Sequence, residues 1–129
     1  MATSIDGFHH VKVPVSDLAL SRAWYERVFD LVSMHEFVDA DGTPGGVAYQ
    51  PVGGVSLALR ADPPRAVALA GFDPLAFGVP DKAAVDAWAE HLDGLGVPHT
   101  GVLQATIGHA VACTDPDGMN VLVYSRTPG

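Results

Sequence analysis

His9 and His10 stand side by side at the head of an alternating apolar run over residues 8–15. An imidazole can bind a transition metal or carry a proton near neutral pH, so both side chains are candidates for chemistry. Successive side chains of a strand point to opposite faces, so at most one of the two can face a given site. His10 shares its face with Lys12, whereas His9 shares its face with Val11. We therefore expect His10 to face a site and His9 to pack on the helix side of the strand.

The other reactive residue types favour structural roles. Cys113 lies in an apolar, strand-like run, which predicts a buried thiol rather than a nucleophile. Residues 115–118, Asp-Pro-Asp-Gly, are typical of a turn between strands rather than of an acid–base pair. No Ser-His-Asp or Cys-His spacing supports nucleophilic catalysis. Four further histidines are interpreted as packed or solvated structural side chains, although a bulge could turn the last of them to either face: His35, His91, His99 and His109.

The overall composition narrows the classes of protein. The 129 residues suit one domain with a real core. Fifteen acidic against seven basic residues give a net charge of −8, which disfavours nucleic acid as a partner and is compatible with a cationic ligand or with solubility alone. A single cysteine excludes an intrachain disulfide. The sequence lacks an apolar run of membrane-helix length and a signal-peptide pattern at its start, so we expect a soluble cytoplasmic protein that binds no membrane.

An internal repeat organises the chain. Shifting residues 6–60 by 64 positions, without a gap, gives 14 identities in 55 aligned positions. Trp24 falls on Trp88, and Asp17 falls on Asp81. Two copies are too few for a solenoid, so the repeat indicates two similar modules within one domain spanning 1–129. The modules are expected at about 6–60 and 70–126, joined by a proline-containing linker at 61–69.

Each module is predicted to fold as a strand, a helix and three strands. In the first, a half-buried strand at 7–15 precedes a helix that Asp17 caps and that runs to about Phe29. In the second, Asp81 caps a helix from about Lys82 to Leu92, which Gly94 and Gly96 close. The remaining strands are expected near 33–38, 46–51 and 54–60, and near 99–104, 109–114 and 119–125. The pattern is βαβββ twice, in the α+β class.

The repeat, together with its opening and closing motifs, resembles a known superfamily. Residues 9–31, HHVKVPVSDLALSRAWYERVFDL, and residues 115–125, DPDGMNVLVYS, are similar to the glyoxalase / bleomycin resistance protein / extradiol dioxygenase superfamily, the vicinal oxygen chelate (VOC) fold. The resemblance implies a cupped mixed sheet with the helices outside, and a homodimer. It also implies either a metal-dependent lyase, isomerase or oxygenase, or a metal-free protein that sequesters an antibiotic.

The family's ligand positions argue against a metal. The resemblance places up to four ligands in the cup, two in each module, and these slots fall on His10, Ala58, Pro74 and Leu122. Only the first has a ligating side chain, whereas a catalytic divalent ion usually takes three protein ligands. Lys12, on the same face as His10, would also repel a cation. We therefore expect no metal ligands and no cofactor, with a divalent metal as the alternative.

Without a metal, the cup is expected to bind an organic molecule. Strand parity gives a mostly apolar wall with a few polar groups, as small-molecule sites have. Phe8 and Tyr124 could stack on a planar ligand, and Lys12 and Arg60 could accept an anionic or carbonyl-rich group. The expected ligand-binding residues are Phe8, His10, Lys12, Ser56, Ala58, Arg60, Pro74, Ala76, Asn120, Leu122 and Tyr124.

Two functional hypotheses follow from this site. The first is a metal-free protein that binds a hydrophobic or aromatic small molecule, antibiotic sequestration included. The second is an enzyme of the same superfamily, in which His10 serves as general acid or base or as a residual metal ligand. A structural or regulatory dimer is a third, less specific possibility.

Overall fold

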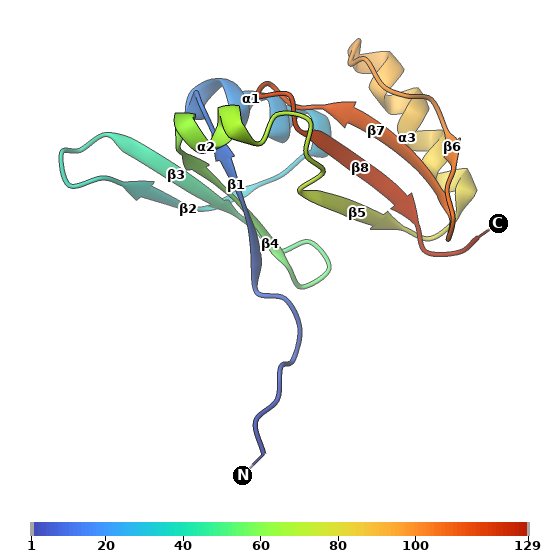
Figure 1. The fold of residues 1–129 in the computed structure, drawn as a ribbon, viewed down its shortest axis with the longest axis horizontal. Helices are drawn as coiled ribbons and strands as arrows, with labels where there is room; N and C mark the ends of the chain where they lie inside the picture. Colours follow the sequence, from blue (N-terminus) through green and yellow to red (C-terminus); the bar gives the residue numbers. More distant parts are fainter. Residues whose placement is uncertain (1, 129) are drawn as a thin grey trace. The chain divides into compact units, whose positions relative to one another are not determined.

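The computed structural model describes residues 2–128 and divides the chain into two compact units, one up to Ala66 and one from Val67 (Figure 1). Each unit holds a four-stranded mixed sheet and a long helix. The first unit contains β1 (His10–Val15), α1 (Leu18–Phe29), β2 (Ser33–Val38), β3 (Pro44–Tyr49) and β4 (Ser56–Ala61). The second contains β5 (Leu75–Val79), α3 (Lys82–Leu95), β6 (Leu103–Gln104), β7 (His109–Thr114) and β8 (Asn120–Ser125). The short helix α2 (Pro63–Ala68) spans the boundary between the units in the sequence. The prediction of an α+β protein built from βαβββ twice is confirmed.

The two sheets have equivalent topology and register. Their strand orders are β1-β4-β3-β2 and β5-β8-β7-β6, with the first pair of each parallel and the others antiparallel. Val11 pairs with Leu57, and the pair 64 residues on is Leu75 with Val121. The same shift relates every pair of β1 and β4 after the first to a pair of β5 and β8. The sequence repeat therefore extends to the strand register.

The predicted helix caps are present. The Asp17 carboxylate accepts from the backbone N–H of Leu20 at 3.1 Å, and the Asp81 carboxylate accepts from that of Ala84 at 3.0 Å. Each satisfies one of the unpaired N–H groups of a first helical turn. At the other end of α3, Gly96 adopts a left-handed φ of +70° and ends the helix. Gly94 was predicted to help close α3 but lies inside it, so the helix runs three residues beyond Leu92.

The expected linker is partly helical. Pro63 and Pro64 lie in the predicted linker and occupy the first turn of α2, where a missing N–H costs nothing because it would have no helical partner. Asp62 stabilises this start, since its carboxylate accepts from the backbone N–H of Arg65 at 3.3 Å. None of the helices between residues 2 and 128 is long and apolar enough to cross a membrane.

The core of the first unit lies between its sheet and α1. Val13 and Val15 of β1 are fully buried, whereas His10 and Lys12 on the other face are exposed, so the predicted alternation of β1 is confirmed. α1 packs against β3 and β4 and buries Tyr25 and Val28. The opposite face of the sheet is thereby left for a site.

A hydrogen-bonded group ties α1 to this sheet. The hydroxyl of the fully buried Tyr49 donates to Glu26 Oε2 at 2.9 Å, and Arg22 Nε donates to the same oxygen at 2.8 Å. Arg22 Nη1 also donates to Glu36 Oε1 at 2.9 Å. Burial, and then the bond to Glu26, raises the pKa of Tyr49, while the bonds to the two glutamates raise the pKa of Arg22. These hydrogen bonds hold the helix against one face of the sheet, and none of the four residues lines the pocket on the other face.

Candidate functional site

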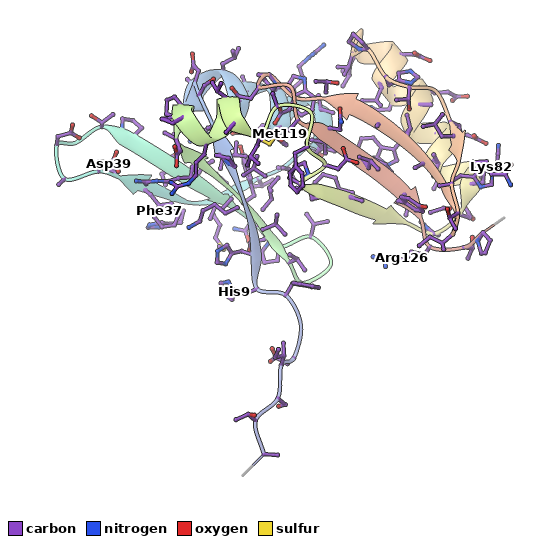
Figure 2. All side chains as sticks on the ribbon, in the orientation of Figure 1. His9, Phe37, Asp39, Lys82, Met119 and Arg126 are labelled. Atoms are coloured by element: carbon purple, nitrogen blue, oxygen red, sulfur yellow. The ribbon has the colours of Figure 1, made fainter. Side chains whose placement is uncertain are left out.

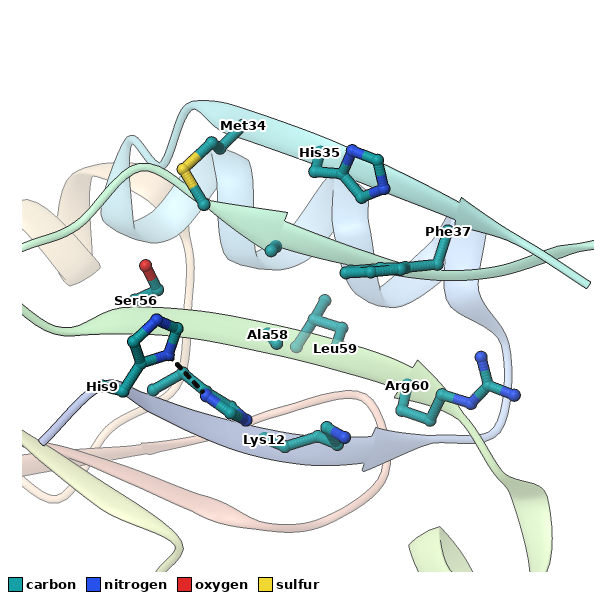
Figure 3. Close-up of a pocket in the computed structure, with 11 residues that line it drawn as sticks. His9, Lys12, Met34, His35, Phe37, Ser56, Ala58, Leu59 and Arg60 are labelled. Carbon is teal, nitrogen blue, oxygen red and sulfur yellow. Dashed lines mark hydrogen bonds between the residues drawn. The ribbon is translucent and has the colours of Figure 1, made fainter.

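A pocket of about 400 Å³ lies on the first unit (Figure 3). Its centre is a row of neighbours across three strands, because Ala58 pairs with Lys12 on one side and with Ala48 on the other. Paired residues of adjacent strands project from the same face, so all three side chains share the face of Lys12, away from the buried Val13. The lining residues are His9, His10, Lys12, Met34, His35, Phe37, Ala48, Ser56, Ala58, Leu59 and Arg60.

Small residues at the centre leave room for a ligand, and residues of β2 line one side of the pocket. Ala48 and Ala58, which pair at the centre, carry only methyl groups. Figure 3 shows the Phe37 ring extending from the edge strand on the side of the pocket opposite Lys12. The His35 and Phe37 rings meet edge to face, with centroids 4.6 Å apart. The pairing of β2 with β3 shifts register between Ser33 and His35, so two adjacent residues, Met34 and His35, both reach the pocket.

Two cations lie toward one end of the pocket (Figure 3). Arg60 Nη2 donates to Asp39 Oδ1 at 3.3 Å, and this ion pair lies against Gly45, where a β-carbon would come within 2.8 Å of Arg60 Nη1. Lys12 forms no salt bridge with any carboxylate of the described residues. This end of the pocket therefore has positive charge available to a ligand.

The two histidines lie toward the other end, and the prediction for His9 was wrong. His9 is exposed and lines the pocket, because β1 begins only at His10 and the preceding residue is not bound by strand alternation. The two Nδ1 atoms lie 2.9 Å apart, and the rings meet edge to face with centroids separated by 5.2 Å. One imidazole must donate and the other accept, so each ring orients its neighbour.

The structure brings together five of the expected ligand-binding residues: His10, Lys12, Ser56, Ala58 and Arg60. Phe8, which is 80% exposed in the segment before β1, does not line the pocket. The other expected residues belong to the second unit, at or beside β5 and β8: Pro74, Ala76, Asn120, Leu122 and Tyr124. Among these, Asn120 Nδ2 donates to Asp73 Oδ1 at 3.0 Å and to the Gly71 carbonyl at 3.2 Å, so its amide holds the loop before β5. Their role in binding stays a prediction.

The donor set does not fit a family-type metal ion. Within residues 2–128, no three His, Cys, Asp or Glu side chains converge in a way that could hold one. Of the two expected ligand slots in the first unit, His10 offers only the ring nitrogen that does not contact His9, and Ala58 offers no donor at all. The metal content of the protein stays a prediction.

The remaining reactive side chains lie in structural environments. Burial, with a smaller contribution from the Asp115 charge, raises the pKa of Cys113 to about 11, which suits an inert thiol. Asp115 Oδ1 accepts from the backbone N–H groups of Asp117 and Met119, each at 2.9 Å, so the Asp-Pro-Asp-Gly segment is a turn, as predicted. His99 bridges Asp93 at 2.7 Å and the N–H of Gly101 at 2.9 Å.

Six lining residues were not predicted: His9, Met34, His35, Phe37, Ala48 and Leu59. Ala48 could have been found from the register, since it pairs with Ala58. His35 was interpreted as a structural side chain, but its spacing of two from Phe37 places both on one face of a strand. No pattern in the sequence indicates that Met34 or His9 lines the pocket. Met34 reaches it only because of the register shift in β2, and His9 lies before the first residue of β1.

Comparison with known proteins defines the class. A family model described as the Glyoxalase/Bleomycin resistance protein/Dioxygenase superfamily matches residues 7–123. The chain belongs to this superfamily, so the resemblance noted from its motifs is confirmed. A search of curated proteins found no match.

Solved structures of similar fold have different activities. A glyoxylase/bleomycin resistance protein/dioxygenase domain from Frankia sp. EAN1pec is 25% identical, with a TM-score of 0.74 over 95% of this chain and 98% of its own. A lactoylglutathione lyase from Agrobacterium tumefaciens is 22% identical, with a TM-score of 0.76 over 95% and 96%. TnmS3, an antibiotic binding protein from Streptomyces sp. CB03234, is 20% identical, with a TM-score of 0.73 over 96% and 98%. The fold thus hosts both an enzyme and a binding protein, and the site must decide between them.

Proposed function

We propose that this protein binds a hydrophobic or aromatic small molecule in the pocket of its first sheet without a metal, antibiotic sequestration included. The observation that carries the proposal is the pocket itself: about 400 Å³, with apolar side chains at its centre and polar groups toward its ends. Pockets of this size and composition bind drug-sized molecules. TnmS3, an antibiotic binding protein of similar fold, is an example of such a function on this fold.

The alternative is an enzyme in which His10 transfers a proton. It is favoured by one observation: the His10 Nδ1 is held by His9, which leaves the other nitrogen of an oriented ring to act in a pocket. The orienting group is a second imidazole rather than a carboxylate. Turnover of a bound compound that disappears in His10→Ala would favour this alternative, whereas unaltered recovery of the compound favours sequestration.

We further propose that the chain acts as a cytoplasmic homodimer. Every residue of the edge strand β2 is exposed, including the large apolar side chains of Met34, Phe37 and Val38. An apolar edge strand of this kind is usually covered. Light scattering on the purified protein should give twice the chain mass of 13.4 kDa, and a monomer at micromolar concentration would contradict the proposal.

The binding proposal can be tested by filling the pocket. The 64-residue repeat places Leu122 where the first module has Ala58, so the fold accepts a leucine at this sheet position. Ala58→Leu should therefore fold yet occupy the centre of the pocket. Binding of N-phenyl-1-naphthylamine, followed by its fluorescence, should weaken at least tenfold in Ala58→Leu.

Ala23→Leu provides the matched control, because Ala23 is exposed on α1 and does not line the pocket. This variant should bind the probe as the wild type does. Equal binding by the two variants, or no binding by the wild type of either the probe or a panel of aromatic antibiotics, would overturn the proposal. Elemental analysis of the same preparation should find less than stoichiometric metal.

A further inference from the structure

The charge of the pocket is opposite to that of the chain. The whole sequence has 15 acidic against seven basic residues and six histidines. Of the eleven side chains that line the pocket, two are the cations Lys12 and Arg60, three are histidines, and none is Asp or Glu. A site for a cationic ligand would show the reverse, because carboxylates would then face the ligand.

Lys12 and Arg60 are placed to act on one ligand group. Lys12 pairs with Ala58 across the junction of β1 and β4, and Arg60 lies two residues further along β4. Both therefore project from the same face, and two long side chains at such positions can reach a common point. Figure 3 shows both beside the apolar centre of the pocket.

Lys12 and Arg60 can both interact with an anionic ligand. No carboxylate of the described residues neutralises Lys12. Arg60 gives one nitrogen to Asp39 at 3.3 Å, which leaves other N–H donors of the guanidinium for a ligand. Asp39 and Gly45 hold that guanidinium close to β3, since the ion pair occupies the space that a side chain at position 45 would fill. An oxyanion could thus accept hydrogen bonds from an ammonium and a guanidinium at once.

From these placements we infer that the pocket selects organic anions: an aromatic or alicyclic body carrying one carboxylate or sulfonate. The body lies over Ala48 and Ala58 against Phe37, and the oxyanion lies between Lys12 and Arg60. This inference rests on the proposed binding function and adds the chemical class of the ligand.

A pair of fluorescent probes distinguishes binding of an aromatic molecule in the pocket from selection of an anionic one. 8-Anilinonaphthalene-1-sulfonate and N-phenyl-1-naphthylamine share the same aromatic body, but only the first carries an oxyanion. At pH 7.5 and low salt, the sulfonate should bind at least tenfold more tightly than the neutral probe. Raising the NaCl concentration to 0.5 M should reduce this ratio, because salt screens the attraction between exposed charges.

Charge-removing variants locate the effect. Lys12→Met and Arg60→Met should each lower affinity for the sulfonate at least fivefold while leaving the neutral probe within twofold of wild type. Lys82→Met is the matched control, because Lys82 does not line this pocket and pairs with Asp86 on α3 at 3.1 Å (Figure 2). It should change neither probe. Circular dichroism of each variant shows whether the fold is kept.

Each outcome decides one claim. Equal binding of the two probes, or a sulfonate preference that survives in both Lys12→Met and Arg60→Met, overturns the inference and leaves the proposed function standing. Failure of both probes to bind wild-type protein removes the proposed function as well. A preference that disappears in the two pocket variants and persists in Lys82→Met supports the inference.

Discussion

Gly45 and Gly46, adjacent on β3, face very different neighbours. A β-carbon at position 46 would come within 2.7 Å of the Leu59 backbone carbonyl oxygen, which belongs to the paired strand. A β-carbon at position 45 would instead meet the ends of two flexible side chains, Asp39 and Arg60. The same substitution at the two positions therefore perturbs the backbone in one case and the anion-binding end of the pocket in the other.

The loss of stability in each variant depends on whether backbone or side-chain atoms must move to accommodate the new β-carbon. In Gly46→Ala, β3 and β4 must separate by several tenths of an ångström to relieve the contact, and such overpacking costs about 1–3 kcal/mol. In Gly45→Ala, loss of a partly exposed ion pair costs at most about 1 kcal/mol, and the lower entropy of the unfolded chain returns about 0.4–1 kcal/mol. We expect Gly46→Ala to be destabilised by about 2 kcal/mol and Gly45→Ala to stay within about 1 kcal/mol of wild type.

Urea unfolding of the two variants, with sulfonate-probe binding on the folded proteins, measures both effects. Gly45→Ala should keep its stability and lose affinity for the anionic probe, since Arg60 is displaced. Equal destabilisation of the two variants would refute the argument that position 46 faces rigid backbone and position 45 faces flexible side chains. Unchanged anion affinity in Gly45→Ala would refute the role given to the position of Arg60.

Three further substitutions or conditions test the scaffold. Tyr49→Phe should cost about 1.5–3 kcal/mol in urea unfolding, because it removes a buried hydrogen bond to the charged Glu26, and a cost near zero would contradict that bond. Asp115→Ala should cost about 2–3 kcal/mol, because two backbone donors lose their acceptor, whereas Asp115→Asn should cost clearly less; equal losses would show that the acceptor oxygen is unimportant. The Cys113 thiol should resist alkylation at pH 8 until the protein unfolds. Because its folded pKa is raised to about 11, its contribution to stability should fall as the pH rises from about 9 to 11, and rapid native alkylation would exclude this burial.

Much of the fold was predictable because its determinants are local. Asp17 and Asp81 precede apolar helical patterns, and valines alternate along β1, so caps, strands and faces follow from short stretches of sequence. The 64-residue repeat then carried the first module's pattern onto the second, and the registers of β1 with β4 and of β5 with β8 agree with it. Pro63 and Pro64 indicated a linker between the modules but did not predict α2, because proline suits both a linker and a first helical turn.

The pocket was predicted only where regular strands line it. Lys12, Ala58 and Arg60 follow from strand parity, but the contribution of β2 depends on a register shift that no local pattern encodes. His9 could not be placed, because the prediction assumed a strand that reached it. Its contact with His10 depends on where β1 begins rather than on alternation.

The central claim, that the pocket of the first sheet binds a small organic molecule, is tested most directly by nuclear magnetic resonance. Titration of ¹⁵N-labelled protein with 8-anilinonaphthalene-1-sulfonate should shift the backbone amide signals of Lys12, Phe37 and Ala58, with saturation at one probe per pocket. Signals of α3, which lies outside the pocket, should stay in place. An unchanged spectrum, or shifts confined to residues from Val67 onward, would contradict the claim.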